Sequence, residues 1–474
     1  MAVVTNDTSN TSDGSAGRKK TSSTTDGPTD MKGEHGKSTA AAVEKKERQR
    51  LLGPSDPLVA AMIKGASDKE ILDMISSNEN HHLLCANNAL ALHLAIERDY
   101  LLDVIEKLVT PVVAMKQPNA YGYPPLHNAI MNDREYYVVL FLLEQNRDAA
   151  AEQLHDCGSL PVHAAVRNQY SLEVIQALVA AFPNGVIAMD RFGCTPLHTA
   201  VMYYLEDVKI GVSVIQFLLT QSADTAAIKN AKNGDFPLHA ALRLKRANGD
   251  YYLALIKLLV DAFPIALEIP DANGCIPLHI TLLDKAADNV DVIKYLLKKN
   301  SKTASLGFDN EDIPLHFALS NHSPFDVIRL LVDAFPEGLL VSNSKDEFPL
   351  FIPLKRKDDR MVAYFLSKLP GSSATKSRNN LPIHLAIELC LSTEVICSLL
   401  AAFPNSLCVT SNGKLPRDLI SVGTEPLTII ALEKSIGFWA FYAHRFRVKG
   451  EPLDDVVSNA VSNLVGAQGL PLRS

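Results

Sequence analysis

A proline–leucine–histidine triplet, or a close variant of it, recurs along the chain at nearly even spacing. Seven copies stand at Pro125-Leu126-His127, Pro161-Val162-His163, Pro196-Leu197-His198, Pro237-Leu238-His239, Pro277-Leu278-His279, Pro314-Leu315-His316 and Pro382-Ile383-His384. Two altered copies, at Ala91-Leu92-His93 and Pro349-Leu350-Phe351, keep the same register, and Pro57 and Pro416 extend it. Nine intervals separate residue 93 from residue 418, which gives about 36 residues per unit. This period predicts a stacked array of small units, each stabilised by its neighbours.

Each unit carries the same local signals. A proline at the first position suits a helix start, because its missing N–H has no partner there in any case. Apolar residues three and four apart further on, such as Val292 and Leu296, predict a second helix. The third residue before the proline is expected to have a positive φ in a tight turn. The residues at that place are Gly122, Gly158, Gly193, Gly234, Gly274 and Gly413, with Glu311, Asp346 and Asn379 in the other units.

These units resemble ankyrin repeats, whose signature is a turn glycine followed two residues later by Thr-Pro-Leu-His-x-Ala. The match covers residues 55 to 430, approximately. The resemblance implies an all-α fold: an ankyrin-repeat solenoid of stacked helix-turn-helix units with short β-hairpin-like turns. The family period is near 33 residues, so the loops or helix ends are expected to hold extra residues here.

The residue before the proline departs from the family. It is threonine only at Thr195, so the hydrogen bonds that the family's threonine shares with the histidine are in question elsewhere. The apolar residues that replace it are predicted to pack into the stack; they are Leu160, Phe236, Ile276, Ile313, Phe348, Leu381 and Leu415.

A second pattern, Ala-Phe-Pro, ends every other unit and lies outside the family signature. Its phenylalanines are Phe182, Phe263, Phe335 and Phe403, about 74 residues apart. Proline stops the preceding helix and makes the phenylalanine extended. We therefore expect the phenylalanine rings to cap the core beneath the loop, in an array that grew by copying pairs of units.

The repeats divide the chain into four parts. Residues 1–52 are polar, without apolar periodicity, and are predicted to be a disordered N-terminal tail. Residues 53–424 form the array, of about ten to eleven units including degenerate caps. Residues 425–450 are predicted to be a C-terminal capping helix and residues 451–474 a C-terminal tail. The capping segment holds the only tryptophan, Trp439, which leaves a weak interfacial membrane contact as the alternative.

Composition narrows the setting. Net charge is −7, from 46 basic and 53 acidic residues, which disfavours nucleic acid as a partner. The seven cysteines include no Cys-x-x-Cys pair, and the N-terminal residues lack a signal peptide, so an intracellular and cytoplasmic location is expected. The basic triplet Arg18-Lys19-Lys20 keeps nuclear import open. No run of 18 apolar residues is present to span a membrane. We expect a monomer.

The repeated histidine is predicted to be structural. A catalytic or metal-binding histidine belongs to one unique cluster, whereas this one occupies equivalent places in successive units. His81, His82 and Cys85 are the one adjacent group of metal-ligand types, and a fourth ligand is missing nearby. Basic clusters around Arg243 and around Lys355 are interpreted as solvated helix faces. Phosphate-loop, dinucleotide and hydrolase motifs are absent. We expect no enzyme activity, no cofactor and no metal.

The resemblance implies that the turns and first helices line a concave groove that holds a protein partner. Four aromatic and arginine residues are the strongest candidates, Tyr121, Tyr123, Arg191 and Phe192. The other turn-tip candidates are Asp156, Lys232, Asn233, Asp235, Asn273, Asp309, Asn310, Asp312, Lys345, Glu347, Arg378, Asn380 and Lys414. Acidic tips at 309–312 and basic tips at 345–378 predict an electrically graded groove. The expected function is a protein-binding scaffold or adaptor; the alternative is a targeting or regulatory subunit of an enzyme whose catalytic chain is separate.

Overall fold

The computed structural model describes residues 57–77, 88–109, 118–119, 121–203, 208–244, 249–283, 290–307, 312–421 and 424–466. Several sequence predictions fall outside these residues. They concern the N-terminal tail (1–52), the possible metal ligands His81, His82 and Cys85, the turn residue Glu311, and the tip candidates Asp309 and Asn310.

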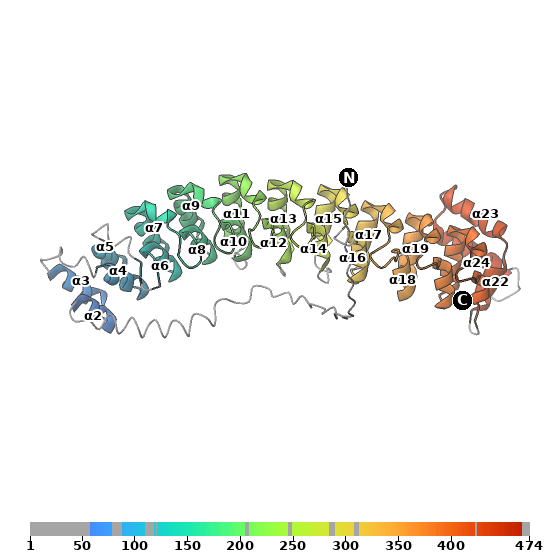
Figure 1. The fold of residues 1–474 in the computed structure, drawn as a ribbon, viewed down its shortest axis with the longest axis horizontal. Helices are drawn as coiled ribbons and strands as arrows, with labels where there is room; N and C mark the ends of the chain where they lie inside the picture. Colours follow the sequence, from blue (N-terminus) through green and yellow to red (C-terminus); the bar gives the residue numbers. More distant parts are fainter. Residues whose placement is uncertain are drawn as a thin grey trace, which may run out of the picture.

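The described residues form antiparallel helix pairs stacked into one elongated, arched array (Figure 1). The first helices of the pairs, called inner helices here, lie on the concave side. They are α2 (Pro57–Lys64), α4 (Asn88–Glu97), α6 (Pro125–Met131), α8 (Pro161–Arg167), α10 (Pro196–Tyr203), α12 (Pro237–Arg243), α14 (Pro277–Leu283), α16 (Pro314–Ser320), α18 (Phe351–Arg356) and α20 (Pro382–Glu388). The outer helices are α3 (Asp68–Ser77), α5 (Leu102–Leu108), α7 (Tyr136–Gln145), α9 (Leu172–Ala181), α11 (Val208–Gln221), α13 (Gly249–Ala262), α15 (Val290–Lys299), α17 (Phe325–Ala334), α19 (Asp359–Lys368) and α21 (Thr393–Ala402).

A short 3₁₀ helix follows each outer helix from α7 onward, and it holds the extra residues that lengthen the unit beyond 33. These helices are η3 (Arg147–Ala151), η4 (Pro183–Val186), η5 (Ala223–Ala227), η6 (Pro264–Leu267), η8 (Ser301–Ser305), η9 (Pro336–Leu340), η10 (Pro370–Ala374) and η11 (Pro404–Cys408). In the Ala-Phe-Pro units the proline is the first residue of this 3₁₀ helix, where its missing N–H costs little. The extra length is therefore regular structure on the convex side.

The turn and helix-start signals are confirmed. All seven prolines of the triplets are the first residue of their inner helix. The six turn glycines have positive φ, as do Asp346 (φ 59) and Asn379 (φ 66). One unit differs, because α18 begins two residues after Pro349. Pro353 then falls in the first helical turn, where backbone N–H groups have no intrahelical partner. A helix start at Pro349 would instead place Pro353 beyond the first turn, where a backbone N–H normally donates to a carbonyl of the helix and proline has none to donate.

The core runs along the whole array between inner and outer helices. Most of the apolar residues before the prolines pack into it as predicted. Leu160, Phe236, Ile276, Ile313 and Leu381 are buried, whereas Phe348 and Leu415 are only half-buried. The four Ala-Phe-Pro phenylalanines are half-buried and pack against the core from its convex side. Glycine two residues after the proline leaves room for two of these rings, because a Cβ at Gly185 would lie 3.1 Å from Cδ1 of Phe182.

The C-terminal end of the stack is closed by three helices, α22 (Pro426–Glu433), α23 (Ile436–Arg447) and α24 (Leu453–Gly466). The 425–450 segment is thus two helices, because Ser435 caps a new helix by accepting a hydrogen bond from Phe438 N at 3.3 Å. The 451–474 segment contains α24, which packs against α21 and buries Leu453, Val456 and Leu464. The cap therefore extends well past residue 450, into the part that we expected to be a tail.

Trp439 lies at the centre of this cap. Its side chain is fully buried, and its indole N–H donates to the carbonyl of Ala431 at 3.1 Å. A buried indole cannot reach a lipid interface, so the membrane alternative for Trp439 is not supported. Across the described helices, none is long and apolar enough to cross a bilayer.

Turn geometry predicts a strong position effect for glycine substitution. Gly193 has φ +75, and an added Cβ would lie 2.6 Å from the backbone nitrogen of Ala231 in the next turn. Gly413 has φ +78, and a Cβ there meets no described heavy atom within 4 Å. We expect Gly413→Ala to cost about 1–2 kcal/mol of stability from left-handed strain alone. Gly193→Ala should cost at least about 1 kcal/mol more, because two turns must separate. Urea unfolding midpoints measure both, and equal midpoints would contradict the close contact.

Candidate functional site: the concave edge of turns

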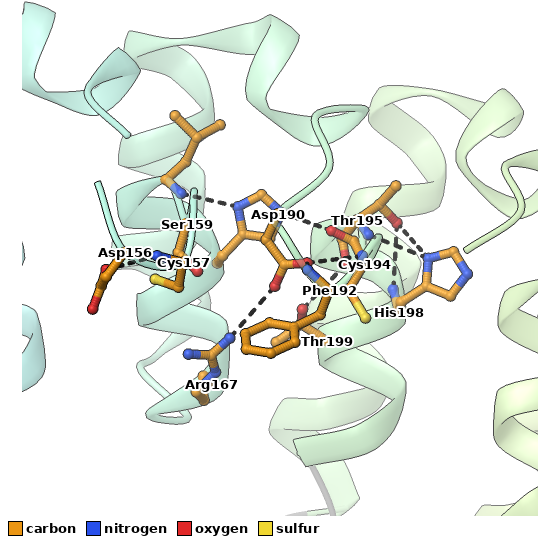
Figure 2. A network of polar contacts seen from close by, with 12 residues as sticks. Asp156, Cys157, Ser159, Arg167, Asp190, Phe192, Cys194, Thr195, His198 and Thr199 are labelled. Atoms are coloured by element: carbon orange, nitrogen blue, oxygen red, sulfur yellow. Dashed lines mark hydrogen bonds and ion pairs between the residues drawn. The ribbon is translucent and has the colours of Figure 1, made fainter. Parts of the chain in front are cut away.

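An Asn or Asp side chain closes five of the described turns that precede an inner helix, those at Asn119, Asp190, Asn230, Asp271 and Asn343. Oδ1 of Asp190 accepts hydrogen bonds from the N–H groups of Phe192 and Cys194, both at 2.9 Å (Figure 2). Asn119, Asp271 and Asn343 accept two turn N–H groups in the same way. A backbone bond closes each loop as well, such as Asp190 N to Cys194 O at 2.9 Å. These rigid loops, called turn tips here, are the hairpin-like turns that the resemblance implied.

Neighbouring turn tips are joined to one another. Arg191 Nη1 donates to the carbonyl of Asp156 at 2.6 Å, and Asn230 Nδ2 donates to the carbonyl of Phe192 at 3.1 Å. Near the other end of the array, Ser377 Oγ donates to the carbonyl of Asp346 at 2.7 Å. Hydrogen bonds therefore connect neighbouring tips into a row on the concave side of the array. This row is called the concave edge here.

In the units of His163, His198, His239 and His316, the repeated histidine bonds through Nδ1 to the N–H of the residue before the proline and lies through Nε2 within hydrogen-bond distance of a carbonyl of the following unit. In the α8 unit, His163 Nδ1 accepts from the N–H of Leu160 at 3.2 Å, and Nε2 lies 3.2 Å from the carbonyl of Cys194. Thr195 adds its hydroxyl, 2.9 Å from His198 Nδ1. Without the threonine hydroxyl, the backbone N–H bond to the histidine remains at Phe236 and Ile313, whereas Nδ1 of His384 in the Leu381 unit has no hydrogen-bond partner among the described residues.

Burial keeps these histidines neutral. Loss of solvation lowers the pKa to about 4 for His127, His163, His239 and His279. It also lowers the pKa of His198, His316 and His384. The rings carry no charge near neutral pH, and in the units of His163, His239 and His316 both ring nitrogens lie within hydrogen-bond distance of backbone groups, so the role of the histidine is structural.

Charged side chains at the ends of inner helices reach back to the tips. Arg243, which ends α12, lies 3.2 Å from Asp235 through Nε and also pairs with Asp271 of the next tip. Arg167, which ends α8, lies 3.6 Å from Asp190 in the next unit (Figure 2). Arg243 is exposed, as expected for a solvated helix residue, and it also links two buried carboxylates. Burial raises the pKa of Asp235, partly offset by Arg243.

The structure sorts the predicted tip residues into four groups. The exposed ones are Tyr121, Asp156, Arg191, Phe192, Lys232, Asn233, Asn273, Lys345, Arg378 and Lys414. The half-buried ones are Tyr123, Asp312, Glu347 and Asn380. Asp235 is buried and holds Arg243, so its carboxylate does not face a partner. Asp309 and Asn310 lie outside the described residues.

The helix pairs, the Pro-Leu-His starts and the histidine bonds from turn to turn define the architecture. The fold is an ankyrin-repeat solenoid. Among solved structures, the chain is similar to the ankyrin repeat domain of Bcl-3, a unique member of the IkappaB protein family, at 23% identity and a TM-score of 0.41. That similarity covers 51% of this chain and 96% of the Bcl-3 domain. No family model matches the sequence.

Several surface residues of this ankyrin array escaped the sequence argument. Met131, Tyr203 and Leu283 end the inner helices α6, α10 and α14, and each is exposed. Arg167 lies over the ring of Tyr203, 5.8 Å from its centroid, and Lys232 lies 5.2 Å from that of Phe192. The sequence does contain a signal for Met131, Tyr203 and Leu283. Each stands six or seven positions after the repeat proline, at the end of the inner helix.

No group of three or more His, Cys, Asp or Glu side chains among the described residues is placed to hold a metal ion. The concave edge carries aromatic and cationic side chains on turns that are hydrogen-bonded to one another. Such a composition favours contact with macromolecules.

Proposed function

We propose that this protein is a non-enzymatic scaffold or adaptor that binds a protein partner along the concave edge of its ankyrin array. The observation that supports it is the set of exposed aromatic and arginine side chains Tyr121, Arg191 and Phe192 on rigid, joined tips. Such side chains contribute large contact energies, and they lose little conformational entropy when their loops are already rigid. Each unit adds a small patch, so affinity comes from several units engaged together.

The setting we propose is intracellular, with one copy of the chain per partner. The six described cysteines are all free, which suits a reducing compartment. The alternative function is that the partner is an enzyme chain that this array targets or regulates. Both use the same surface, and the identity of the captured partner separates them.

Site-specific photo-crosslinking tests the proposed surface. Benzoylphenylalanine would replace Phe192 or Tyr121 on the concave edge, with Lys298, exposed on the outer helix α15, as the matched control. We expect a crosslinked protein from the two edge positions and none from position 298. Crosslinks from position 298 alone would move the partner to the convex face and refute the concave site. Far-UV circular dichroism would verify that the three variants fold equally.

A further inference from the structure

The last turn tips of the array carry unneutralised positive charge. Lys345, Lys376, Arg378 and Lys414 are exposed, and none forms an ion pair with another described residue. These four residues are called the basic edge here. They belong to the tips before α18, before α20 and after η11.

Two of the nearby carboxylates are engaged within the protein, whereas Glu388, which ends α20, is exposed. Glu347 accepts from Lys355 Nζ at 2.5 Å, and Asp312 accepts from the N–H of Ser344 at 2.7 Å. Asp346 is the one exposed carboxylate of the tips between residues 343 and 414. Of the acidic tips expected at 309–312, only Asp312 lies among the described residues, and its carboxylate accepts the hydrogen bond from Ser344.

The basic edge has a defined spacing. Ser377 Oγ bonds to the carbonyl of Asp346, and Ser411 Oγ bonds to Oδ1 of Asn380, so three successive tips are held together. Stacked helical units lie about 8–10 Å apart. An extended polyproline II segment advances about 3.1 Å per residue with three residues per turn, so every third side chain lies on the same face. A carboxylate at every third residue of an extended segment would therefore meet one tip cation after another.

We propose that the basic edge binds an extended acidic segment of a partner protein, with carboxylates about three residues apart. The inference rests on the proposed function in taking the concave edge as the binding surface, and it names the chemistry of the partner. A nucleic acid fits less well, because the described basic tips hold no exposed aromatic ring for base stacking. The net charge of −7 also repels a long polyanion, whereas a short acidic segment meets only the local positive field.

The test uses the full chain and two fluorescent peptides of identical composition, measured by anisotropy. One peptide has glutamate at every third residue, and the other has its glutamates in one block. We expect tighter binding of the spaced peptide. The combined variant Lys345→Glu, Arg378→Glu, Lys414→Glu should weaken that binding by about tenfold or more.

The matched control changes the same amount of charge elsewhere. Lys294→Glu, Lys298→Glu, Lys302→Glu alters three exposed lysines on α15 and η8, on the outer side. The dissociation constant should stay within about twofold, since these lysines belong to the outer helix and 3₁₀ helix of an earlier unit and salt screens charges over about 8–10 Å. Equal losses of peptide affinity in both variants would show that the effect comes from net charge alone. That result would overturn the proposal. A third variant, Lys345→Gln, Arg378→Gln, Lys414→Gln, removes the positive charges without adding negative ones. A loss of peptide affinity in this variant cannot come from introduced repulsion.

Two further results would also overturn it. One is indifference to glutamate spacing, and the other is tighter binding of a single-stranded oligonucleotide or of phosphatidylserine vesicles than of the spaced peptide. The outcome is separable from that of the proposed function. Peptide binding without crosslinks at position 192 would refute the aromatic site and leave the basic edge standing. Crosslinks without peptide binding would refute the basic edge alone.

Discussion

Acidification from pH 6.5 to pH 4 is expected to destabilise the array strongly. The cause is the row of buried histidines, four of which have a pKa lowered to about 4 from the usual 6.5. The unfolded chain takes up protons below pH 6.5 while the folded chain does not, so stability is present above 6.5 and is lost as pH falls. Each histidine contributes about 1.4 kcal/mol per pH unit near pH 5. Four together reach on the order of 5 kcal/mol per unit.

Urea unfolding midpoints at half-unit pH steps measure the effect, with proton uptake from calorimetry in buffers of different ionisation enthalpy. Carboxylates also respond to acid, so a variant must isolate the histidines. His163→Asn keeps a polar group beside Leu160 N and Cys194 O and removes one titrating site. In this variant, the number of protons that the chain takes up on unfolding at pH 5 should be lower by about one. A midpoint that stays constant between pH 6.5 and pH 5 would show that the histidines titrate normally in the fold.

Removal of the Trp439 side chain is expected to open the C-terminal end of the stack. Trp439→Ala deletes a fully buried indole that joins α23 to α22 through its bond to Ala431, and large aromatic truncations cost about 3–5 kcal/mol. In a solenoid this loss falls on the end unit first, because each unit depends on its neighbours. Hydrogen exchange should therefore accelerate in α21 to α24 and remain unchanged in α6 to α10.

Phe441→Ala is the matched control for this substitution. It lies on the same helix, α23, and its side chain is 59% exposed, so its removal leaves no cavity. We expect its cost to stay below about 0.5 kcal/mol. If both variants exchanged alike, or if Trp439→Ala left α21 protected, the helices after residue 425 would not be a cap on the array.

The repeat units were predictable because their signals are local. A proline at the first helical position and a glycine with positive φ act on the backbone of the residue that carries them. Counting along the chain therefore placed the inner helices from Pro125 to Pro382, with an error only at Pro349. That error also has a local cause, since Pro353 four residues later competes for the first helical turn.

The cap was less predictable. The sequence indicated an apolar segment around Trp439 but not that α24 would return to cover α21. No period or turn residue marks that contact, because it joins segments about 60 residues apart that share no repeat register. The choice between a tail and a packed helix depended on whether an unburied face of α21 was there to receive it.

The sequence by itself determined the period, the helix starts, the left-handed turns and the structural role of the histidine, all of which follow from local backbone constraints and from repetition. The tertiary structure decided which tip residues remain free. Asp235 and Lys414 both stand two residues before the repeat proline, yet only Lys414 is exposed, because Arg243 binds Asp235 from eight residues further on. Pairing between charged side chains depends on distances in space, and these are set by the stacking of neighbouring units rather than by the repeat pattern.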